Sequence, residues 1–211
     1  MTVGPGAALA LGTQAETKVY RPPPGAEPAR QTLRGRVEAG GLLALLPDPV
    51  SPYAGARYVQ SQRFELCPGG SLALLDAVTA GRAARGERWA FAHHATRNVV
   101  TAGGALALAD ALRLAQGEGP PLPERLAGLE LLATIVLLGP ALAAGAQAAL
   151  EAVAQRPADG GAPVLIAASP LRDGAVLRIA ARSVEAGMDE VRRHLAFLAG
   201  PLDGDPLLRR P

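Results

Sequence analysis

A short pattern of glycine followed by alternating leucines recurs four times along the chain. Each copy reads Pro or Ala, Gly, a small residue, any residue and then Leu-Ala-Leu, and the copies occupy residues 5–11, 39–45, 68–74 and 102–108. Their first leucines, Leu9, Leu43, Leu72 and Leu106, are spaced by 34, 29 and 34 residues. Glycine supplies the positive φ of a tight turn, and alternate leucines then line one face of a strand. Repetition at this period is typical of a stacked architecture.

Segments of alternating character lead into these glycine turns. In residues 31–38, Leu33 and Val37 fall on one face of an extended strand, and the charged Arg34, Arg36 and Glu38 fall on the other. Residues 58–66 and 97–101 also have the composition of strands. The repeating unit is therefore strand, glycine turn, strand and connection. It predicts a mainly β fold of repeated antiparallel hairpins in stacked sheets, a β-solenoid-like scaffold.

The C-terminal half of the chain predicts two α-helices among further strands. Residues 131–138 have the composition of a buried strand, and residues 141–155 that of a helix. Two short apolar runs, 164–168 and 175–181, predict a hairpin, and apolar residues at three- and four-residue spacing predict an amphipathic helix over 183–198. The uncharged stretch 131–150 is interrupted by Gly139 and Pro140, which favours a strand followed by a helix over a membrane span.

Composition and charge narrow the class of protein. The chain has 211 residues, of which 49% are hydrophobic and 19% charged, which suits one domain with a sizeable core. The net charge is only +2, and no basic run or aromatic platform accompanies it, so nucleic acid binding has little support. The single cysteine excludes an internal disulfide framework. With no basic segment before the apolar N-terminal stretch, we expect a cytoplasmic protein.

Side chains suited to catalysis or to tight metal binding are scarce. The chain has no phosphate-binding loop, dinucleotide fingerprint or nucleophile elbow, so no catalytic residue is assigned. Adjacent residues of a strand point to opposite faces, so His93 and His94 cannot both reach one ion on a regular strand. Cys67 lies beside a predicted turn with no second cysteine, which favours a structural thiol over a metal ligand.

Two polar clusters remain as candidate sites. Residues 76–88 are the densest and carry Asp76, Thr79, Arg82, Arg85, Glu87 and Arg88. They are either a solvated loop with surface ion pairs or a surface that binds a protein partner. Residues 13–21 place Thr13, Gln14, Thr17 and Lys18 around Tyr20, where they either line a cleft or border a strand.

The same two clusters resemble a known family. Residues 13–21, Thr-Gln-Ala-Glu-Thr-Lys-Val-Tyr-Arg, resemble the signature of the urease accessory protein D family, called UreD or, in some bacteria, UreH. Residues 40–57, 81–87 and 133–140 resemble further segments of that family in the same order. Family members carry an additional N-terminal stretch with a Gly-Gly-Asp segment. The resemblance therefore predicts a single, N-terminally shortened UreD-like domain over residues 1–200 and a partly ordered tail over 201–211.

The resemblance implies a scaffold and not an enzyme. Family members dock on the urease apoprotein with accessory proteins F and G, the latter a GTPase, and deliver nickel to the urease active site. The family is understood to offer nickel a water-filled passage, so we expect no tightly bound cofactor, no closed metal site, and nickel as transient cargo. No nucleic acid or membrane partner is implied. The candidate residues for partner binding or ion passage are Thr13, Gln14, Thr17, Lys18, Tyr20, Asp76, Arg82 and Glu87.

Two other functions remain open from the residues alone. The first is a β-rich protein-binding module with no relation to urease, in which the motifs only reflect a shared scaffold. The second is an enzyme that acts through His93, Asp76 or Glu87.

Overall fold

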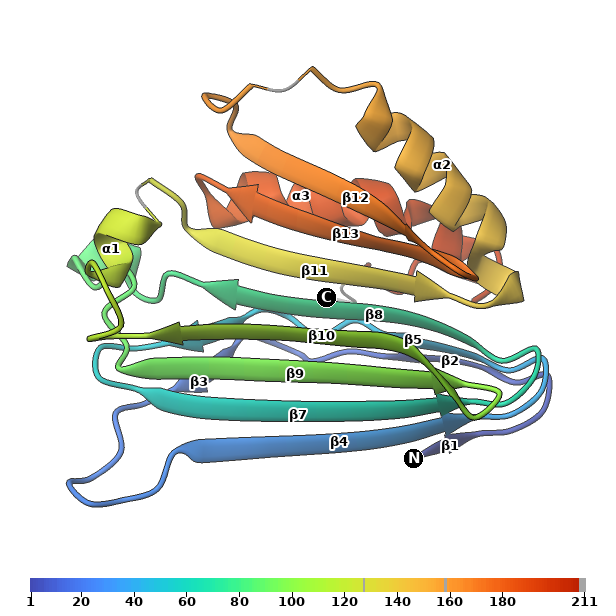
Figure 1. Ribbon diagram of the computed structural model, residues 1–211, viewed down its shortest axis with the longest axis horizontal. Helices are drawn as coiled ribbons and strands as arrows, with labels where there is room; N and C mark the ends of the chain where they lie inside the picture. The colour runs from blue at the N-terminus through green and yellow to red at the C-terminus, as the bar shows by residue number, and fades with distance from the viewer. Residues whose placement is uncertain (127, 158, 209–211) are drawn as a thin grey trace.

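The computed structural model describes residues 1–126, 128–157 and 159–208, which form a β-solenoid of about 3 turns with helices against one side (Figure 1). The chain passes alternately through a five-stranded first sheet, ordered β1-β4-β7-β9-β10, and an eight-stranded second sheet, ordered β12-β13-β11-β8-β5-β2 with β3 and β6 beside it. The predicted mainly β, solenoid-like scaffold is confirmed. The first coil of the solenoid comprises β1 (Thr2–Val3), β2 (Ala8–Leu11) and β3 (Thr17–Val19). The second coil comprises β4 (Ala29–Val37), β5 (Leu42–Leu45) and β6 (Val50–Pro52). The third coil comprises β7 (Arg57–Leu66) and β8 (Ser71–Thr79).

The glycine repeat sets the register of these coils. Leu9 pairs with Leu43, and Leu43 pairs with Leu72, so the equivalent leucines of three repeats stack on one another. The pairing is parallel, which corrects the prediction of antiparallel hairpins: each glycine turn carries the chain from one sheet to the other, so its two strands do not pair with each other. Sequence shows the turn but not the sheet that receives the next strand.

Close stacking of the turns explains why glycine recurs there. A Cβ atom at Gly70 would lie 2.8 Å from the carbonyl oxygen of Val37, and one at Gly41 would lie 3.0 Å from that of Gly4. The first oxygen lies at the end of β4 and the second in the turn between β1 and β2, so each belongs to the preceding coil. Side chains at these positions would therefore push neighbouring coils apart.

The fourth copy of the repeat forms a true hairpin. Strand β9 (His93–Ala102) continues the first sheet parallel to β7, and β10 (Ala105–Ala115) returns antiparallel to β9. Gly103 and Gly104 provide the turn, with φ of 56° and 82°. Leu106 therefore lies opposite Thr101 of its own hairpin and not against Leu72.

The C-terminal half closes the second sheet and covers its outer face. Strand β11 (Leu131–Leu138) pairs antiparallel with β8 and with β13 (Gly174–Ala181), which forms the predicted hairpin with β12 (Val164–Leu171). The predicted helices are α2 (Ala143–Ala154) and α3 (Val184–Leu195), and both pack on this sheet (Figure 1). A third helix, α1 (Leu122–Arg125), was not predicted because four residues are too short to show a helical period. Short 3-10 segments lie at Ala83–Arg85, Pro140–Leu142 and Ala196–Ala199.

The core has one layer beneath the helices and one between the sheets. Ile135, Leu177 and Val191 belong to the helix-side layer. Leu202 and Leu207 of the predicted tail also pack there, whereas residues 209–211 of that tail lie outside the described residues. Between the sheets are two separate apolar clusters, one around Phe64 and Leu72 and one around Trp89 and Phe91. No helix in the described part of the chain is long and apolar enough to cross a membrane.

The first coil is the outermost coil among the described residues. Within the described residues, β2 pairs only with β5, and all four residues of β2 are exposed. Leu9 and Leu11 are among the exposed large hydrophobic residues of the protein.

Candidate functional site

A layer of polar side chains separates the two apolar clusters between the sheets. We call it the polar layer and define it as Gln60, Gln62, Asp76, Thr96 and Asn98. Strand β7 alternates so that Gln60 and Gln62 share the inward face with Tyr58 and Phe64, and β9 likewise buries Thr96 and Asn98. Asn98 is 0% exposed and Gln62 only 3%.

The members of the polar layer satisfy one another by hydrogen bonds centred on Asp76. Asn98 Nδ2 donates to Asp76 Oδ2 at 2.7 Å, and Gln60 Nε2 donates to Asp76 Oδ1 at 3.2 Å. Gln62 Nε2 donates to Asn98 Oδ1 at 2.9 Å. Tyr58 adds its hydroxyl, which donates to Gln60 Oε1 at 3.0 Å. The network links β7, β8 and β9 across both sheets.

Burial has the largest influence on the pKa of the Asp76 carboxyl group, which lies at the centre of this network. It raises the pKa of Asp76, while the hydrogen bonds from Asn98, Thr96 and Gln60 act in the opposite direction. The nearby carboxylate of Asp110, on β10, raises the pKa of Asp76 further. Asp110 itself pairs with Arg178 of β13, with Nη2 and Oδ1 2.5 Å apart.

His94 lies beside the polar layer at its boundary with the Trp89 cluster. Its ring stacks on Tyr58, with centroids 5.7 Å apart, and lies 5.9 Å from the centroid of Phe91. Only 1% of the residue is exposed, and neither ring nitrogen has a hydrogen-bond partner among the described residues. Burial lowers the pKa of His94 to about 4. His93 is less buried, and its pKa is lowered by partial burial and by Arg113 and Arg57.

A cavity of about 350 Å³ opens beside these residues. Asp76, His94 and Thr96 line it from the interior, and Leu112 of β10 and Ile166 of β12 are among its apolar walls. The ion pair of Asp110 and Arg178 also lines it. Because β10 and β12 are the last strands of their sheets, we call this space the edge cavity.

A second polar group gathers on the surface, and we call it the tyrosine–arginine cluster: Tyr20, Tyr53, Arg82 and Glu87. Tyr20 and Tyr53 meet edge to face with centroids 5.1 Å apart, and Arg82 lies over the Tyr53 ring at 4.3 Å. Arg82 also forms a two-point ion pair with Glu87, at 2.9 and 2.5 Å. This pairing and a backbone N–H from Ala54 lower the pKa of Glu87.

A glycine holds the Arg82 loop against the second coil. Gly81 has φ of 89°, and a Cβ atom there would lie 2.5 Å from the carbonyl oxygen of Pro52. Only glycine fits both the backbone conformation and the contact. Because Pro52 and Tyr53 are adjacent in the chain, this approach places Arg82 over the Tyr53 ring.

The structure divides the predicted site residues among three places: the tyrosine–arginine cluster, the polar layer and the segment that leads into β3. Tyr20, Arg82 and Glu87 meet in the tyrosine–arginine cluster, whereas Asp76 lies in the polar layer, because β8 continues to Thr79 and turns Asp76 inward. Thr13 exchanges hydrogen bonds with Asp48, donating to Oδ2 at 3.0 Å and accepting from the backbone N–H at 2.8 Å. Gln14 is exposed just before β3, which contains Thr17 and Lys18.

Sequence reasoning missed Gln60, Gln62, Thr96 and Asn98. A signal was present: in β7 and β9 these polar residues occupy the same alternating phase as Tyr58, Phe64 and Val100, which are buried. Polar residues in a buried phase indicate an internal network.

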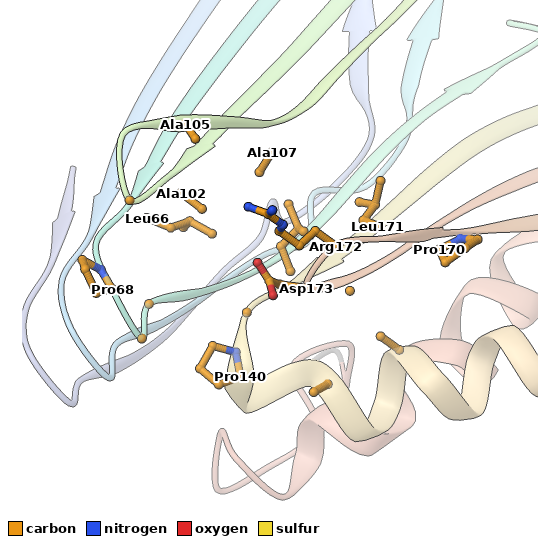
Figure 2. Close-up of a pocket in the computed structure, with 18 of the residues that line it drawn as sticks. Leu66, Pro68, Ala102, Ala105, Ala107, Pro140, Pro170, Leu171, Arg172 and Asp173 are labelled. Atoms are coloured by element: carbon orange, nitrogen blue, oxygen red, sulfur yellow. The ribbon is translucent and has the colours of Figure 1, made fainter.

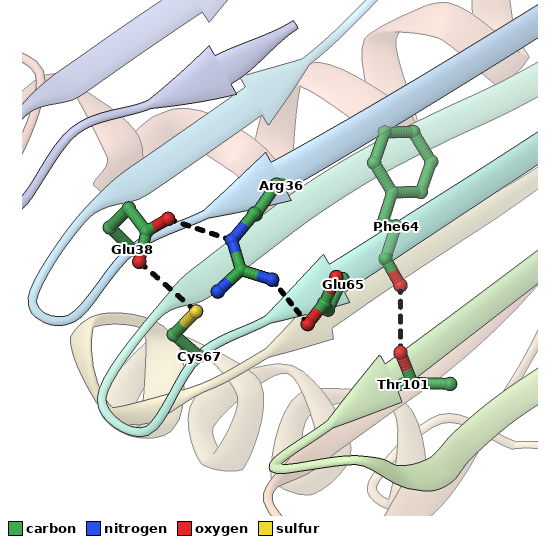
Figure 3. A network of polar contacts seen from close by, with 6 residues as sticks. All are labelled: Arg36, Glu38, Phe64, Glu65, Cys67 and Thr101. Carbon is green, nitrogen blue, oxygen red and sulfur yellow. Dashed lines mark hydrogen bonds and ion pairs between the residues drawn. The ribbon is translucent and has the colours of Figure 1, made fainter.

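The free thiol of Cys67 forms a hydrogen bond beside the glycine turn that follows β7. Its Sγ donates to Glu38 Oε2 at 3.2 Å, and this contact is the main cause of the raised pKa of Cys67 (Figure 3). Arg36 donates to Glu38 at 2.7 Å and to Glu65 at 2.5 Å. The group ties the second coil to the third. Nowhere in the described ranges do three His, Cys, Asp or Glu side chains gather closely enough to hold a metal ion.

A larger hollow of about 880 Å³ lies at the same end of the molecule. Figure 2 shows the turns around Pro68 and Ala102 on one side, Pro140 at the start of the helical segment on another, and Arg172 and Asp173 at the β12–β13 turn. Its walls are mainly small and apolar. It is separate from the edge cavity, with which it shares no lining residue.

The fold and its interior define a β-solenoid scaffold with helices on one sheet and a polar layer between the sheets. Comparison with known sequences identifies the family. The family described as UreD urease accessory protein matches residues 1–210, and the chain belongs to this family. The resemblance noted in the sequence is thereby confirmed.

Individual relatives agree with this assignment. The chain is 56% identical over 209 residues to "Urease accessory protein UreD" of Anaeromyxobacter sp. (strain Fw109-5), covering 99% of this chain and 70% of that protein. It is 48% identical to the protein of the same name in Sorangium cellulosum (strain So ce56), covering 99% and 65%. It is 32% identical to "Urease accessory protein D" of Oryza sativa subsp. indica, covering 94% and 72%. The chain thus spans about two thirds of the length of these relatives.

Proposed function

We propose that this chain is a non-catalytic urease maturation factor that acts in the cytoplasm. In this proposal it docks on the urease apoprotein together with accessory proteins F and G, the latter a GTPase, and supports insertion of nickel into the urease active site. Membership of the UreD family supports the role in urease maturation. The polar layer is the structural observation that carries the nickel part of the proposal.

The composition of the polar layer favours passage of a cation over a purely structural role. The layer places a partly buried carboxyl group and buried neutral amides between two clusters of apolar side chains. Burying polar groups is costly unless they are hydrogen-bonded, and even then apolar packing is often equally stable. Oxygen ligands on neutral amides and one carboxylate bind a divalent cation weakly, which suits cargo that must leave again.

The tyrosine–arginine cluster suits the docking part of the proposal. Tyr20 is 66% exposed, and its ring is supported from beneath by Tyr53. Exposed tyrosine and arginine are over-represented among the residues that dominate protein–protein binding energy. The ion pair with Glu87 and the stacking on Tyr53 hold Arg82 in one orientation, which reduces the entropy lost when a partner binds.

Co-purification and nickel loading test the two parts separately. The chain is co-expressed with urease apoprotein and accessory proteins F and G, and the complex and its nickel content are measured. We expect Asp76→Asn to preserve the complex and reduce urease activation, and Tyr20→Ala to weaken the complex. Asp189→Asn, which alters an exposed carboxylate of α3, is the matched control.

Two outcomes contradict the proposal. Failure of the unaltered chain to associate with urease or the accessory proteins, while a longer UreD relative does so in parallel, would favour a β-rich binding module unrelated to urease. Full urease activation by Asp76→Asn would remove the polar layer from the route of the ion.

A further inference from the structure

We propose that the outer edge of β12 is the surface through which two copies of this chain associate. In this dimer the β12 strands of the two copies lie side by side and antiparallel, so that the two second sheets join into one. The inference goes beyond the proposed function and does not depend on it, because β12 contributes no residue to the polar layer or to the tyrosine–arginine cluster.

The backbone of β12 is unpaired on one side. Within the described residues β12 pairs only with β13, and Figure 1 shows no further strand beside it. Arg182 N–H donates to the carbonyl oxygen of Pro163 at 2.9 Å, in register with this pairing. Because backbone groups alternate along an antiparallel ladder, the N–H and C=O groups of Val164, Ile166 and Ala168 point outward. None of these groups has a hydrogen-bond partner in the described part of the chain.

Strand β12 also lacks the charged residues that usually protect a free edge. All eight residues of Val164–Leu171 are uncharged. Strand β10, the last strand of the first sheet, instead carries Asp110 and Arg113. Charged side chains on an edge strand oppose pairing with another chain. Of these two outermost strands, β12 is therefore the one suited to pairing.

The position of Pro170 agrees with a two-fold arrangement centred on Ile166. Placing Ile166 of one copy opposite Ile166 of the other brings Val164 of each copy opposite Ala168 of the other, and each opposed pair can exchange two N–H···O bonds. Pro170 shares the outward phase but has no N–H to donate. It lies beyond these pairs, so the proline costs none of the new hydrogen bonds.

The side chains of this arrangement are complementary in size. Val164 and Ala168 pack toward the helices, where Val164 of one copy would contact Ala168 of the other. Leu165 and Ala167 line the edge cavity on the opposite face, where Leu165 of one copy would contact Ala167 of the other. A large side chain thus meets a small one on both faces of the joined sheet, which allows close cross-strand packing.

Strand β2 is the competing edge. Its four residues, Ala8–Leu11, are uncharged and exposed. They form a strand half as long as the eight residues of β12, so fewer backbone pairs can form there. We therefore assign the contact to β12 and make β2 the alternative outcome of the test.

The dimer should be weak and insensitive to salt. A single pair of strands buries less surface than a standard protein interface, so we expect a dissociation constant of about 10–100 μM. Because β12 carries no charged side chain, raising the salt concentration should not dissociate the dimer.

Sedimentation equilibrium of the tag-free full chain, over concentrations that span this range, tests the contact. Three variants make the same change at an exposed alanine of three edge strands: Ala167→Lys in β12, Ala109→Lys in β10 and Ala10→Lys in β2. We expect Ala167→Lys to weaken the dimer by about tenfold or more, because its ammonium group would face Leu165 of the other copy. The two control variants should dimerise like the unaltered chain. Circular dichroism checks that each variant is folded.

A cross-linking experiment tests the register independently. Opposed residues of a hydrogen-bonded antiparallel pair have Cα atoms about 5.5 Å apart, which a disulfide can span. In a Cys67→Ser background, Ile166→Cys should therefore form a covalent dimer on mild oxidation, and Ala10→Cys should remain monomeric.

Four results would overturn the inference. They are a chain that stays monomeric over the whole concentration series, a folded Ala167→Lys variant that dimerises as tightly as the unaltered chain, loss of the dimer in Ala10→Lys alone, and cross-linking of Ala10→Cys in place of Ile166→Cys. The last two would assign the contact to β2. Co-purification with urease is a separate measurement, so the proposed function stands or falls independently.

Discussion

The stacking of glycine turns makes a quantitative prediction about Gly70. A Cβ atom at this position would lie 2.8 Å from the Val37 carbonyl oxygen and 3.1 Å from that of Cys67. Both contacts are to backbone, so Gly70→Ala can be accommodated only by separating the second and third coils. Two hydrogen bonds between these coils are at risk, from Cys67 N–H to Val37 and from Ser71 N–H to Gly41, each 2.9 Å long.

The expected loss follows from these contacts. Each hydrogen bond contributes about 1 kcal/mol, and the overlap adds a packing cost of about 1–2 kcal/mol, so Gly70→Ala should lower the free energy of unfolding by about 3–4 kcal/mol. The matched control is Gly104→Ala in the β9–β10 hairpin. Gly104 has φ of 82° but no atom within 4 Å of a Cβ, so only the left-handed backbone is penalised, by about 1–2 kcal/mol.

Urea denaturation followed by tryptophan fluorescence measures both losses. Trp89 is the only tryptophan in the sequence and is buried, so its emission reports unfolding without a label. Equal losses of stability for the two variants, or a larger loss for Gly104→Ala, would refute the inference that only glycine at position 70 allows the second and third coils to stack this closely.

Three further predictions concern single side chains. Burial lowers the pKa of His94 from 6.5 to about 4, so the free energy of unfolding is highest above pH 6.5 and falls by about 3 kcal/mol as the pH drops from 6.5 to 4. Plots of stability against pH for His94→Phe should lack this decrease. A decrease parallel to that of the unaltered protein would contradict the prediction. Ser183→Ala removes the side-chain oxygen that accepts a hydrogen bond from Ala186 N–H at the start of α3, so thermal denaturation should show a loss of about 1 kcal/mol, with Ser169→Ala as the comparison. Arg82→Ala should leave the thermal denaturation midpoint almost unchanged in the same assay, because its ion pair with Glu87 is partly exposed to solvent. An unfolded Arg82→Ala protein, seen by circular dichroism, would show that the arginine is structural.

The sequence reveals the repeat but not the direction in which its strands pair. The register of Leu9, Leu43 and Leu72 follows directly from the motif, and the structure confirms it. The same motif leads to a turn between sheets in three copies and to a hairpin in the fourth. What differs is the surrounding structure: β7 lies beside β9 in the first sheet, and β11 occupies the place beside β8 in the second. A seven-residue pattern does not indicate such long-range contacts.

The sequence likewise predicts only part of how the candidate site residues are grouped. Tyr20 is distant in sequence from Arg82 and Glu87, yet the sequence singles out all three as candidates, and the structure places them together. Asp76 was grouped with Arg82 because both occur in one polar stretch, yet strand alternation directs it into the interior. Its partners Gln60 and Asn98 come from other strands, and only the packing of the two sheets brings them to it.

The exposed strand β2 has a consequence for how stability is distributed along the solenoid. In a linear stack each coil is stabilised mainly by its immediate neighbours, so opening events begin at the end with one neighbour. Strand β2 pairs only with β5 within the described residues, whereas β8 is held between β5 and β11. Amide hydrogens of β2 should therefore exchange with solvent sooner than those of β5, and those of β5 sooner than those of β8. The polar layer, built on β7, β8 and β9, lies in the slowly exchanging part of this gradient and keeps its geometry while the first coil opens and closes.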